Sequence, residues 1–267
     1  MSRKIIVLAS VLLGAVGIYA AQQQREGYNN TPFLPGQKWR VHDIDRPYPP
    51  EVTPGATVGA PPSDAVVLFD GKDLSEWTMG NGKECRWKLE DGTMQVAPGT
   101  GSILSKKKFG DCQIHLEWQE DEKVTGRGQG RGNSGIYIMG LFELQILDSY
   151  RAATYADGQA GAVYGQWPPM VNPIKKPGEW QTYDIIFETP KFKYGKLVSP
   201  AYVTLLFNGV MVHNHQKYNG PSAHASLEEY SEIPAEGQIL LQDHGPREKL
   251  RFRNIWVRPI KGYDTGK

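Results

Sequence analysis

Three polar side chains interrupt the apolar run FELQILDSY at residues 142–150. Glu143, Gln145 and Asp148 stand at positions i, i+2 and i+5 of a stretch with the composition of a β-strand. Side chains of a strand alternate between its two faces, so Glu143 and Gln145 share a face and Asp148 is out of step. A β-bulge at Ile146–Leu147 would return Asp148 to that face, because a bulge inserts one residue. We therefore predict two carboxyl groups and one amide on one face, a set suited to acid–base chemistry.

The same spacing resembles the Glu-x-Asp-x-x-Glu strand of laminarinase-like glycosidases. Gln145 and Asp148 depart from that pattern, since they replace its Asp and its acid/base Glu. A retaining glycosidase needs two carboxyl groups about 5–5.5 Å apart, and the short side chain of Asp148 fits this requirement poorly. An incidental polar trio on a solvated strand is the alternative interpretation.

A second candidate acid or base lies in GQILLQDHG, residues 237–245. Alternation puts Gln242 and His244 on one face of this strand-like run and Asp243 on the other. An imidazole titrates near neutral pH, so His244 at the end of a strand could act as acid or base. A hydrogen-bonded histidine at the rim of a site is the alternative.

His213 and His215 share one face of the run VMVHNH at i, i+2 spacing, which would supply half of a metal site. The sequence offers no clear third and fourth ligands. We therefore assign no metal ligands and no cofactor, and leave open whether a divalent cation assists.

The segment GRGQGRGNSGIY, residues 126–137, is rich in glycine but lacks the Gly-Lys-Ser/Thr of a phosphate-binding loop. It leads into a strand, so we predict a loop that approaches a ligand closely, with Arg127 and Arg131 as anchors. Amide and hydroxyl groups on the polar strand faces would orient a polyhydroxylated ligand. The predicted substrate-binding residues on these strands are Asn133, Tyr137, Gln145 and Gln242.

Aromatic residues punctuate the Gly- and Pro-rich segment from Tyr150 to Gly178, among them Tyr155, Tyr164 and Trp167. Such rings stack on the C–H faces of sugars, and we predict Tyr164 and Trp167 as substrate-binding residues. Aromatic side chains that only pack the loop against the protein are the alternative.

The elements that must position these residues are strands. RWKLEDGTMQV (86–96) and YVTLLFNGVMVHNH (202–215) each have a two-residue Asp-Gly or Asn-Gly turn between β-rich runs, a strong hairpin signal. CQIHLEWQ (112–119) alternates apolar and polar residues throughout. At most a short helix is expected at 226–232. We predict an all-β sandwich or jelly roll of antiparallel strands.

The charge balance argues against nucleic acid as a partner. The 267 residues include 30 basic and 29 acidic ones, for a net charge of +1. Phosphate binding needs a concentrated positive surface. The triplet Lys106–Lys108 is the basic cluster of the sequence. We interpret it as a solvated turn, or as charged residues on an edge strand that prevent aggregation.

Residues 1–21 have a basic start and an apolar stretch of signal-peptide length, and a membrane anchor is the alternative. We expect export to the periplasm or the exterior, without stable membrane insertion after cleavage. A Pro- and Gly-rich extended leader is predicted over 22–64 and the main domain over 65–262. Export would place the protein in an oxidising compartment, and we predict that Cys85 and Cys112 lie close enough to form a disulfide. The alternative is that they are two small buried side chains.

The order of several segments, including VVLFDGKDLSEW, GNSGIYI, FELQILD and ILLQDHG, resembles the 3-keto-disaccharide hydrolase domain over roughly residues 65–260. The resemblance implies a concanavalin A-like jelly roll of two antiparallel sheets with a concave groove. It also implies an oligosaccharide or glycoside substrate already oxidised to a ketone at C3.

A C3 ketone acidifies the C2 hydrogen, so one base can remove it and the C1 aglycone leaves by β-elimination before water adds. Glu143 or His244 is the expected base, and Asp148 the acid or orienting group. Two alternatives remain: a carbohydrate-binding module without turnover, and an ordinary retaining glycosidase acting on unoxidised glucan.

Overall fold

The computed structural model describes residues 25–245 and 249–266, so the predicted signal peptide lies outside the described residues. Within them the chain forms two compact units, 25–50 with 264–266 and 51–263. The smaller unit contains the isolated bridges Tyr28–Asp43 and Phe33–Arg40. Residues 51–64 of the predicted leader belong to the larger unit. No helix in the described part of the chain is both long and apolar enough to cross a membrane.

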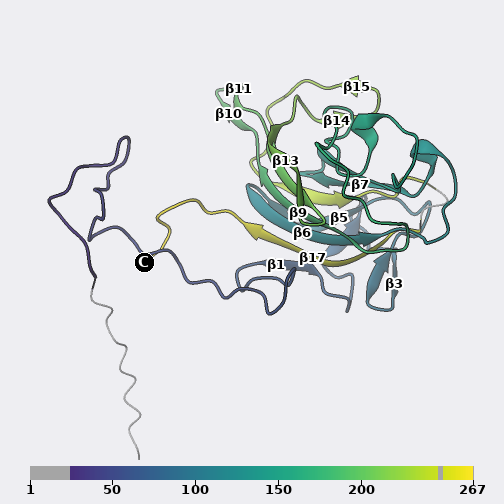
Figure 1. The fold of residues 1–267 in the computed structure, drawn as a ribbon, viewed down its shortest axis with the longest axis horizontal. Coiled ribbons are helices and arrows are strands. Elements are labelled where there is room, and N and C mark those ends of the chain that lie inside the picture. Colours follow the sequence, from purple (N-terminus) through teal and green to yellow (C-terminus); the bar gives the residue numbers. More distant parts are fainter. Residues whose placement is uncertain (1–24, 246–248, 267) are drawn as a thin grey trace, which may run out of the picture. The chain divides into compact units, whose positions relative to one another are not determined.

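The larger unit is a sandwich of two antiparallel sheets. In the larger sheet the strands run in the order β13–β12–β9–β6–β17–β4–β3, with β1 also paired to β17 (Figure 1). Its strands are β1 (Val66–Phe69), β3 (Lys88–Glu90), β4 (Thr93–Gln95), β6 (Cys112–Gln119), β9 (Gln181–Glu188), β12 (Tyr202–Phe207), β13 (Val210–Lys217) and β17 (Arg251–Pro259).

The smaller sheet has the order β2–β5–β16–β7–β8. Its strands are β2 (Trp77–Met79), β5 (Ile103–Phe109), β7 (Asn133–Ile138), β8 (Phe142–Leu147) and β16 (Gly237–Leu241). Outside both sheets lie the 3-10 turns η1 (Gly128–Gly130) and η2 (Ala156–Gly158) and the hairpins β10 (Lys191–Lys193)–β11 (Lys196–Ser199) and β14 (Ser222–Ala223)–β15 (Ser226–Leu227). The predicted all-β jelly roll is confirmed. The segment 226–232, for which at most a short helix was expected, begins with β15 and continues without a helix.

Both predicted hairpins are present. Asp91 and Gly92 join β3 to β4, and Asn208 and Gly209 join β12 to β13. All four residues have positive φ, as the two-residue turn that matches strand twist requires.

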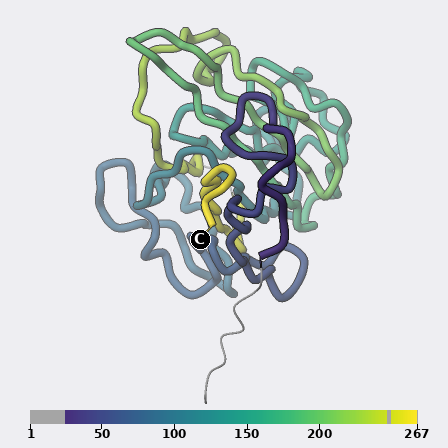
Figure 2. Tube along the Cα trace, turned by 90° about the vertical axis from the view of Figure 1, so that its left-hand side faces the viewer, coloured from purple at the N-terminus to yellow at the C-terminus, as the bar shows by residue number. Residues whose placement is uncertain are grey.

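The core lies between the sheets and draws on segments far apart in sequence. β1 and β4 lie beside β17, where the blue and yellow segments meet in Figure 2. On β6 the apolar side chains Ile114, Leu116 and Trp118 face the core, as the alternation predicts. Lys106–Lys108 are exposed within β5.

Cys85 and Cys112 are both free thiols, so the predicted bridge is wrong. Cys112 is fully buried in β6, between its strand partners Phe187 and Pro259. Cys85 is half-buried in the connection that precedes β3. The alternative of two small buried side chains therefore describes them better.

Candidate active site

A polar pocket of about 130 Å³ lies on the face of β7 and β8 that points away from the core. In the β7–β8 ladder, Asn133, Gly135 and Tyr137 lie opposite Leu147, Gln145 and Glu143. All of β8 is buried on both faces, because loops cover its polar side. The pocket is lined by Gln129, Asn133, Tyr137, Glu143, Gln145, Tyr164, Ala223, His224, Gln242 and His244.

Glu143 is the carboxyl group of this pocket and is only 3% exposed. Burial raises its pKa to about 7, although a hydrogen bond from the Tyr137 hydroxyl opposes the shift. Burial and the neighbouring Glu143 charge raise the pKa of Tyr137 above its ordinary range, so its hydroxyl stays protonated and donates. Gly135 makes room here, because a Cβ at that position would collide with the Glu143 carboxyl. A carboxyl that titrates near neutral pH can accept and return a proton.

Amide side chains line the pocket beside Glu143. The Gln145 amide nitrogen donates to Gln129 Oε1 at 2.9 Å, and the Gln242 amide nitrogen donates to the Tyr137 hydroxyl at 3.1 Å. The Gln145 and Gln242 side-chain oxygens are buried without a hydrogen-bond partner among the described residues. A buried acceptor without a partner is costly, so both oxygens are suited to accept hydrogen bonds from ligand hydroxyls.

Two histidines stand at the exposed side of the pocket. His244 Nε2 lies 3.5 Å from the Asn133 amide nitrogen, and His224 Nδ1 lies 3.0 Å from the Tyr164 hydroxyl. Burial lowers the pKa of His244, with Asp243 opposing and His224 adding to the shift. A neutral imidazole can accept a proton near neutral pH.

Gln129 and His224 were not predicted from the sequence. Gln129, in η1, donates to Thr154 Oγ1 and to the carbonyl of Gly158, both at 2.8 Å, and so ties the Gly-rich loop to the aromatic segment. His224 is in the tight turn between β14 and β15. Its place in the Gly-rich loop is the sequence signal that could have indicated Gln129, whereas no periodic pattern marks His224.

Asp148 and Arg131 are not part of this pocket. The β7–β8 register continues unshifted to Asn133–Leu147, so the predicted bulge at Ile146–Leu147 is wrong and the strand ends before Asp148. Asp148 is instead paired with Arg131, whose Nε donates to Oδ2 at 2.8 Å. Both residues line a separate cavity of about 420 Å³.

Trp167, a predicted substrate-binding residue, and the two histidines considered as half of a metal site also lie elsewhere. Trp167 packs against the core beside Val163, with which it forms a bridge, so it fixes the loop rather than lining the pocket. His213 is buried and its Nε2 contacts the Gly161 carbonyl at 2.8 Å. Irregular pairing of β12 with β13 leaves His215 exposed and stacked on Tyr202, so the two histidines form no joint site. Within the described residues, no group of three or more His, Cys, Asp or Glu side chains could hold a metal ion.

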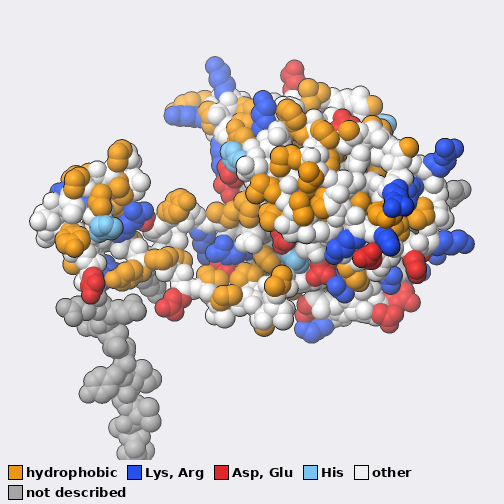
Figure 3. Space-filling model, in the orientation of Figure 1, with side chains coloured by type: hydrophobic (Ala, Val, Ile, Leu, Met, Phe, Trp, Pro, Cys, Tyr) orange, Lys and Arg blue, Asp and Glu red, His pale blue; other side chains and the backbone are white. Residues whose placement is uncertain are grey.

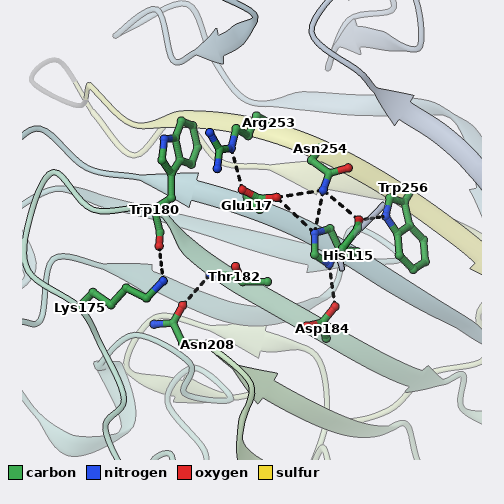
Figure 4. Close-up of polar contacts among 11 residues, drawn as sticks. His115, Glu117, Lys175, Trp180, Thr182, Asp184, Asn208, Arg253, Asn254 and Trp256 are labelled. Atoms are coloured by element: carbon green, nitrogen blue, oxygen red, sulfur yellow. Dashed lines mark hydrogen bonds and ion pairs between the residues drawn. The ribbon is translucent and has the colours of Figure 1, made fainter. Parts of the chain in front are cut away.

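A second titratable cluster lies on the outer face of the larger sheet (Figure 4). His115 Nδ1 is 2.7 Å from Asp184 and its Nε2 is 3.6 Å from Glu117. The carbonyl of Gly59 accepts hydrogen bonds from Asn254 and Trp256, both at 2.9 Å, and so lies over His115, which is 2% exposed. The covered imidazole indicates that this cluster holds the 51–64 segment on the sheet.

Comparison with known proteins identifies the family. The 3-keto-alpha-glucoside-1,2-lyase-like domain matches residues 64–258. A candidate glycosyl hydrolase from Parabacteroides distasonis ATCC 8503 is 41% identical, with a TM-score of 0.78 over 85% of this chain and 100% of that one. A comparison with curated proteins returns no match.

More distant structures share the fold alone. Two further candidate glycosyl hydrolases from Parabacteroides distasonis ATCC 8503 are each 23% identical, with TM-scores of 0.55 and 0.53. The first alignment covers 74% of this chain and 94% of that one, and the second covers 73% and 99%.

Proposed function

This chain belongs to the 3-keto-alpha-glucoside-1,2-lyase-like family, and we propose that it cleaves the glycosidic bond of 3-keto-glycosides. Membership of the family supports a carbohydrate-active function. The observation that carries the proposed reaction is the buried Glu143 carboxyl, whose pKa is about 7, in a small pocket of amides and histidines. A space of about 130 Å³ lies below the range of roughly 300–1,000 Å³ typical of drug-sized ligands, and it suits a single sugar ring.

In the proposed reaction the Glu143 carboxylate takes the C2 proton of the 3-keto ring, and the C–H electron pair enters the C2–C3 bond as an enolate. The enolate then re-forms the ketone, a C1–C2 double bond forms and the C1–O bond breaks. The leaving oxygen carries away that bond's electron pair and takes up a proton. Addition of water across the C1–C2 double bond gives the free 3-keto sugar, so the sum is hydrolysis.

The neighbouring groups would stabilise the negative charge that develops on the enolate oxygen and on the leaving oxygen. A donor is needed where the enolate oxygen develops, and the Asn133 amide stands in the same pocket. The Tyr137 hydroxyl, which donates to the Glu143 carboxylate, could turn to the enolate oxygen once Glu143 has taken up the proton. The acceptor oxygens of Gln145 and Gln242 would fix sugar hydroxyls. His244 would exchange a proton at the exposed side, either as acid for the leaving oxygen or as a second base.

The pocket favours this chemistry over that of a retaining glycosidase. Among the described residues that line it, Glu143 is the one carboxyl group. A retaining mechanism needs two carboxyl groups roughly 5–5.5 Å apart. Proton abstraction next to a ketone needs one base, which Glu143 supplies. A carbohydrate-binding module without turnover would not need a titratable group at the floor of its pocket.

The deciding experiment compares an aryl glucoside with its 3-keto form, in H₂O and in D₂O. We expect release of the phenol from the 3-keto form only, with deuterium at C2 of the first-formed sugar. Early time points and an enzyme-free control separate this label from slow exchange of the product. Cleavage of the unoxidised glucoside would indicate the ordinary glycosidase, and binding of both sugars without cleavage the binding module.

We also propose that the protein works outside the cytoplasm, on the basis of the basic and apolar residues 1–21. Expression with a C-terminal tag, followed by cell fractionation and N-terminal sequencing, tests this. Full-length precursor that accumulates in the cytosol would contradict it.

A further inference from the structure

A larger hollow of about 440 Å³ adjoins the active-site pocket. Tyr164 and His224 line both spaces, so the pocket and the hollow adjoin at a junction formed by these two side chains. Beyond this junction the hollow is bounded by Tyr155, Ala225 and Leu227, with Asp157 among the remaining lining residues.

The hairpin β14–β15 forms one wall of this hollow and is fixed by hydrogen bonds. Ser222, in β14, accepts a hydrogen bond from the Glu143 backbone nitrogen at 3.0 Å and donates its own N–H to Leu141 O at 2.9 Å. The Gln166 side chain joins the loop before the hairpin to the aromatic segment, through Gly220 O at 3.0 Å and Asn219 N at 2.7 Å. The wall of the hollow is therefore anchored to the strand that carries Glu143.

Most polar side chains of the hollow already have hydrogen-bond partners within the protein. The Tyr155 and Tyr164 hydroxyls are 3.0 Å apart, and the Tyr164 hydroxyl is 3.0 Å from His224 Nδ1. The Ser226 hydroxyl donates to Glu228 at 3.0 Å. What is left for a ligand is mainly apolar surface, with Leu227 64% exposed and Tyr155 43% exposed. Figure 3 shows hydrophobic side chains exposed over the part of the larger unit that contains β14 and β15.

We propose that this hollow is the aglycone subsite and that it takes a flat, apolar aglycone such as a phenolic ring. The inference rests on the proposed function. With the 3-keto ring in the small pocket, the C1–O bond that breaks must point out of that pocket, and the hollow is the space that adjoins it at Tyr164 and His224. The tyrosine rings and Leu227 offer stacking and apolar contact to a planar group.

A second hexose is a poorer match for the same surface. Its hydroxyls would lose water, while the tyrosine and histidine groups are already hydrogen-bonded to each other and the Ser226 hydroxyl to Glu228. Asp157 is the acidic group of the hollow and could serve few of these hydroxyls. Polar groups buried without partners weaken binding. Selectivity for the aglycone therefore follows from hydrogen bonds that are already made.

The test measures kcat/KM of the wild-type protein for two 3-keto-glucosides of the same anomer, one with a phenolic aglycone and one with glucose as aglycone. We expect the phenolic substrate to be preferred. Leu227→Asn should lower kcat/KM for the phenolic substrate by about tenfold, the lower end of the range for a changed hydrophobic pocket contact. The same change should lower kcat/KM for the disaccharide by clearly less, because a hydroxylated aglycone gains less from the apolar contact. Leu89→Asn, at an exposed leucine in β3, is the matched control and should change neither.

The outcomes separate the two proposals. Cleavage of both substrates with equal efficiency, and no selective effect of Leu227→Asn, would overturn the aglycone subsite and leave the reaction standing. Cleavage of neither would overturn the proposed function together with the subsite. A melting temperature for each variant shows that folding is intact, which the exposure of both leucines favours.

Discussion

Tyr137 and Glu143 are direct partners across the β7–β8 ladder, and their side chains meet in a hydrogen bond inside the pocket. The Gln242 amide donates in turn to the Tyr137 hydroxyl at 3.1 Å. The chain of donors therefore runs from Gln242 through Tyr137 to the carboxyl group. Because each group in this chain donates toward Glu143, the hydrogen bonds orient the carboxylate and limit how far burial raises the pKa of Glu143.

Replacing Glu143 by Gln should abolish most of the turnover of a 3-keto-glucoside. The change is nearly isosteric and removes the base, for which a loss of about 10²–10⁴-fold in rate is expected. Calorimetry should still detect substrate binding, since the amides and rings around the site remain. Glu90→Gln, at an exposed glutamate in β3, is the control and should behave like the wild type. Near-normal turnover by Glu143→Gln would move the role of base to His244.

The pH dependence of kcat/KM should show the titration of Glu143. A base must be deprotonated to act, so kcat/KM should rise with pH and level off above about 7, the pKa of this carboxyl. Tyr137→Phe removes the hydrogen bond that lowers this pKa, so the rise should move to higher pH. Tyr194→Phe, at a tyrosine 90% exposed, should leave the profile unchanged. A profile of Tyr137→Phe that keeps the wild-type midpoint would contradict the pairing.

Gly135→Ala should reduce activity without preventing folding. The added Cβ would meet the Glu143 carboxyl, which must turn away from its position beside Tyr137. We expect a drop of about tenfold or more in kcat, because small misplacements of a reacting group can cost up to about 10²-fold. Gly80→Ala is the control, since its Cβ would have only Leu104 nearby, at 3.8 Å. Equal activity of the two variants would show that the space at Gly135 has no role in positioning Glu143.

How much of the site could be predicted depends on where each residue lies. Alternation correctly grouped Glu143 with Gln145, which lie in β8, and Gln242 with His244, which follow β16 within three residues. Alternation alone also placed Asp148 out of step with them, and the error was the bulge added to bring it back. Asp148 follows the end of β8, and a buried arginine binds its carboxylate.

Residues on loops could not be placed from periodicity. His224 reaches the pocket because Ser222 ties its hairpin to β8, a contact between residues 79 positions apart. In the same way, His115 follows the alternation of β6, yet nothing in that strand indicated the Gly59 segment that covers it. Local patterns determine the face of a strand, whereas long-range packing determines what covers that face.

The His115 cluster should make stability depend on pH above neutrality. Burial alone would lower the pKa of His115, but hydrogen bonds and charges of Asp184 and Glu117 raise it to about 9. The folded state therefore holds a proton more tightly than the unfolded chain. This stabilisation is fully present below the ordinary pKa of about 6.5 and is lost as pH rises through about 9.

Asp184→Asn tests this linkage. Because Asp184 is partly exposed, solvent screens the pair, and we expect a loss of only about 1 kcal/mol of unfolding free energy at pH 6. Denaturation in urea at pH 6 and at pH 9.5 should show the difference from the wild type shrinking at the higher pH. Asp121→Asn, at an exposed aspartate, should show no such trend. A difference that is constant across this range would exclude a charged His115.

Asp148→Asn should reduce stability while leaving the chemistry largely intact. Asp148 is 3% exposed and its partner Arg131 is 9% exposed, so the variant leaves a buried guanidinium without a counter-charge. Breaking a buried pair in this way costs about 3–5 kcal/mol, and the Tyr150 carbonyl, 3.1 Å from Arg131 Nη1, would recover part of it. At a temperature where the variant is folded, its kcat on a 3-keto-glucoside should stay within a few-fold of the wild type. A loss of turnover on the scale of Glu143→Gln, with the melting temperature unchanged, would instead make Asp148 the acid that the spacing FELQILD first suggested.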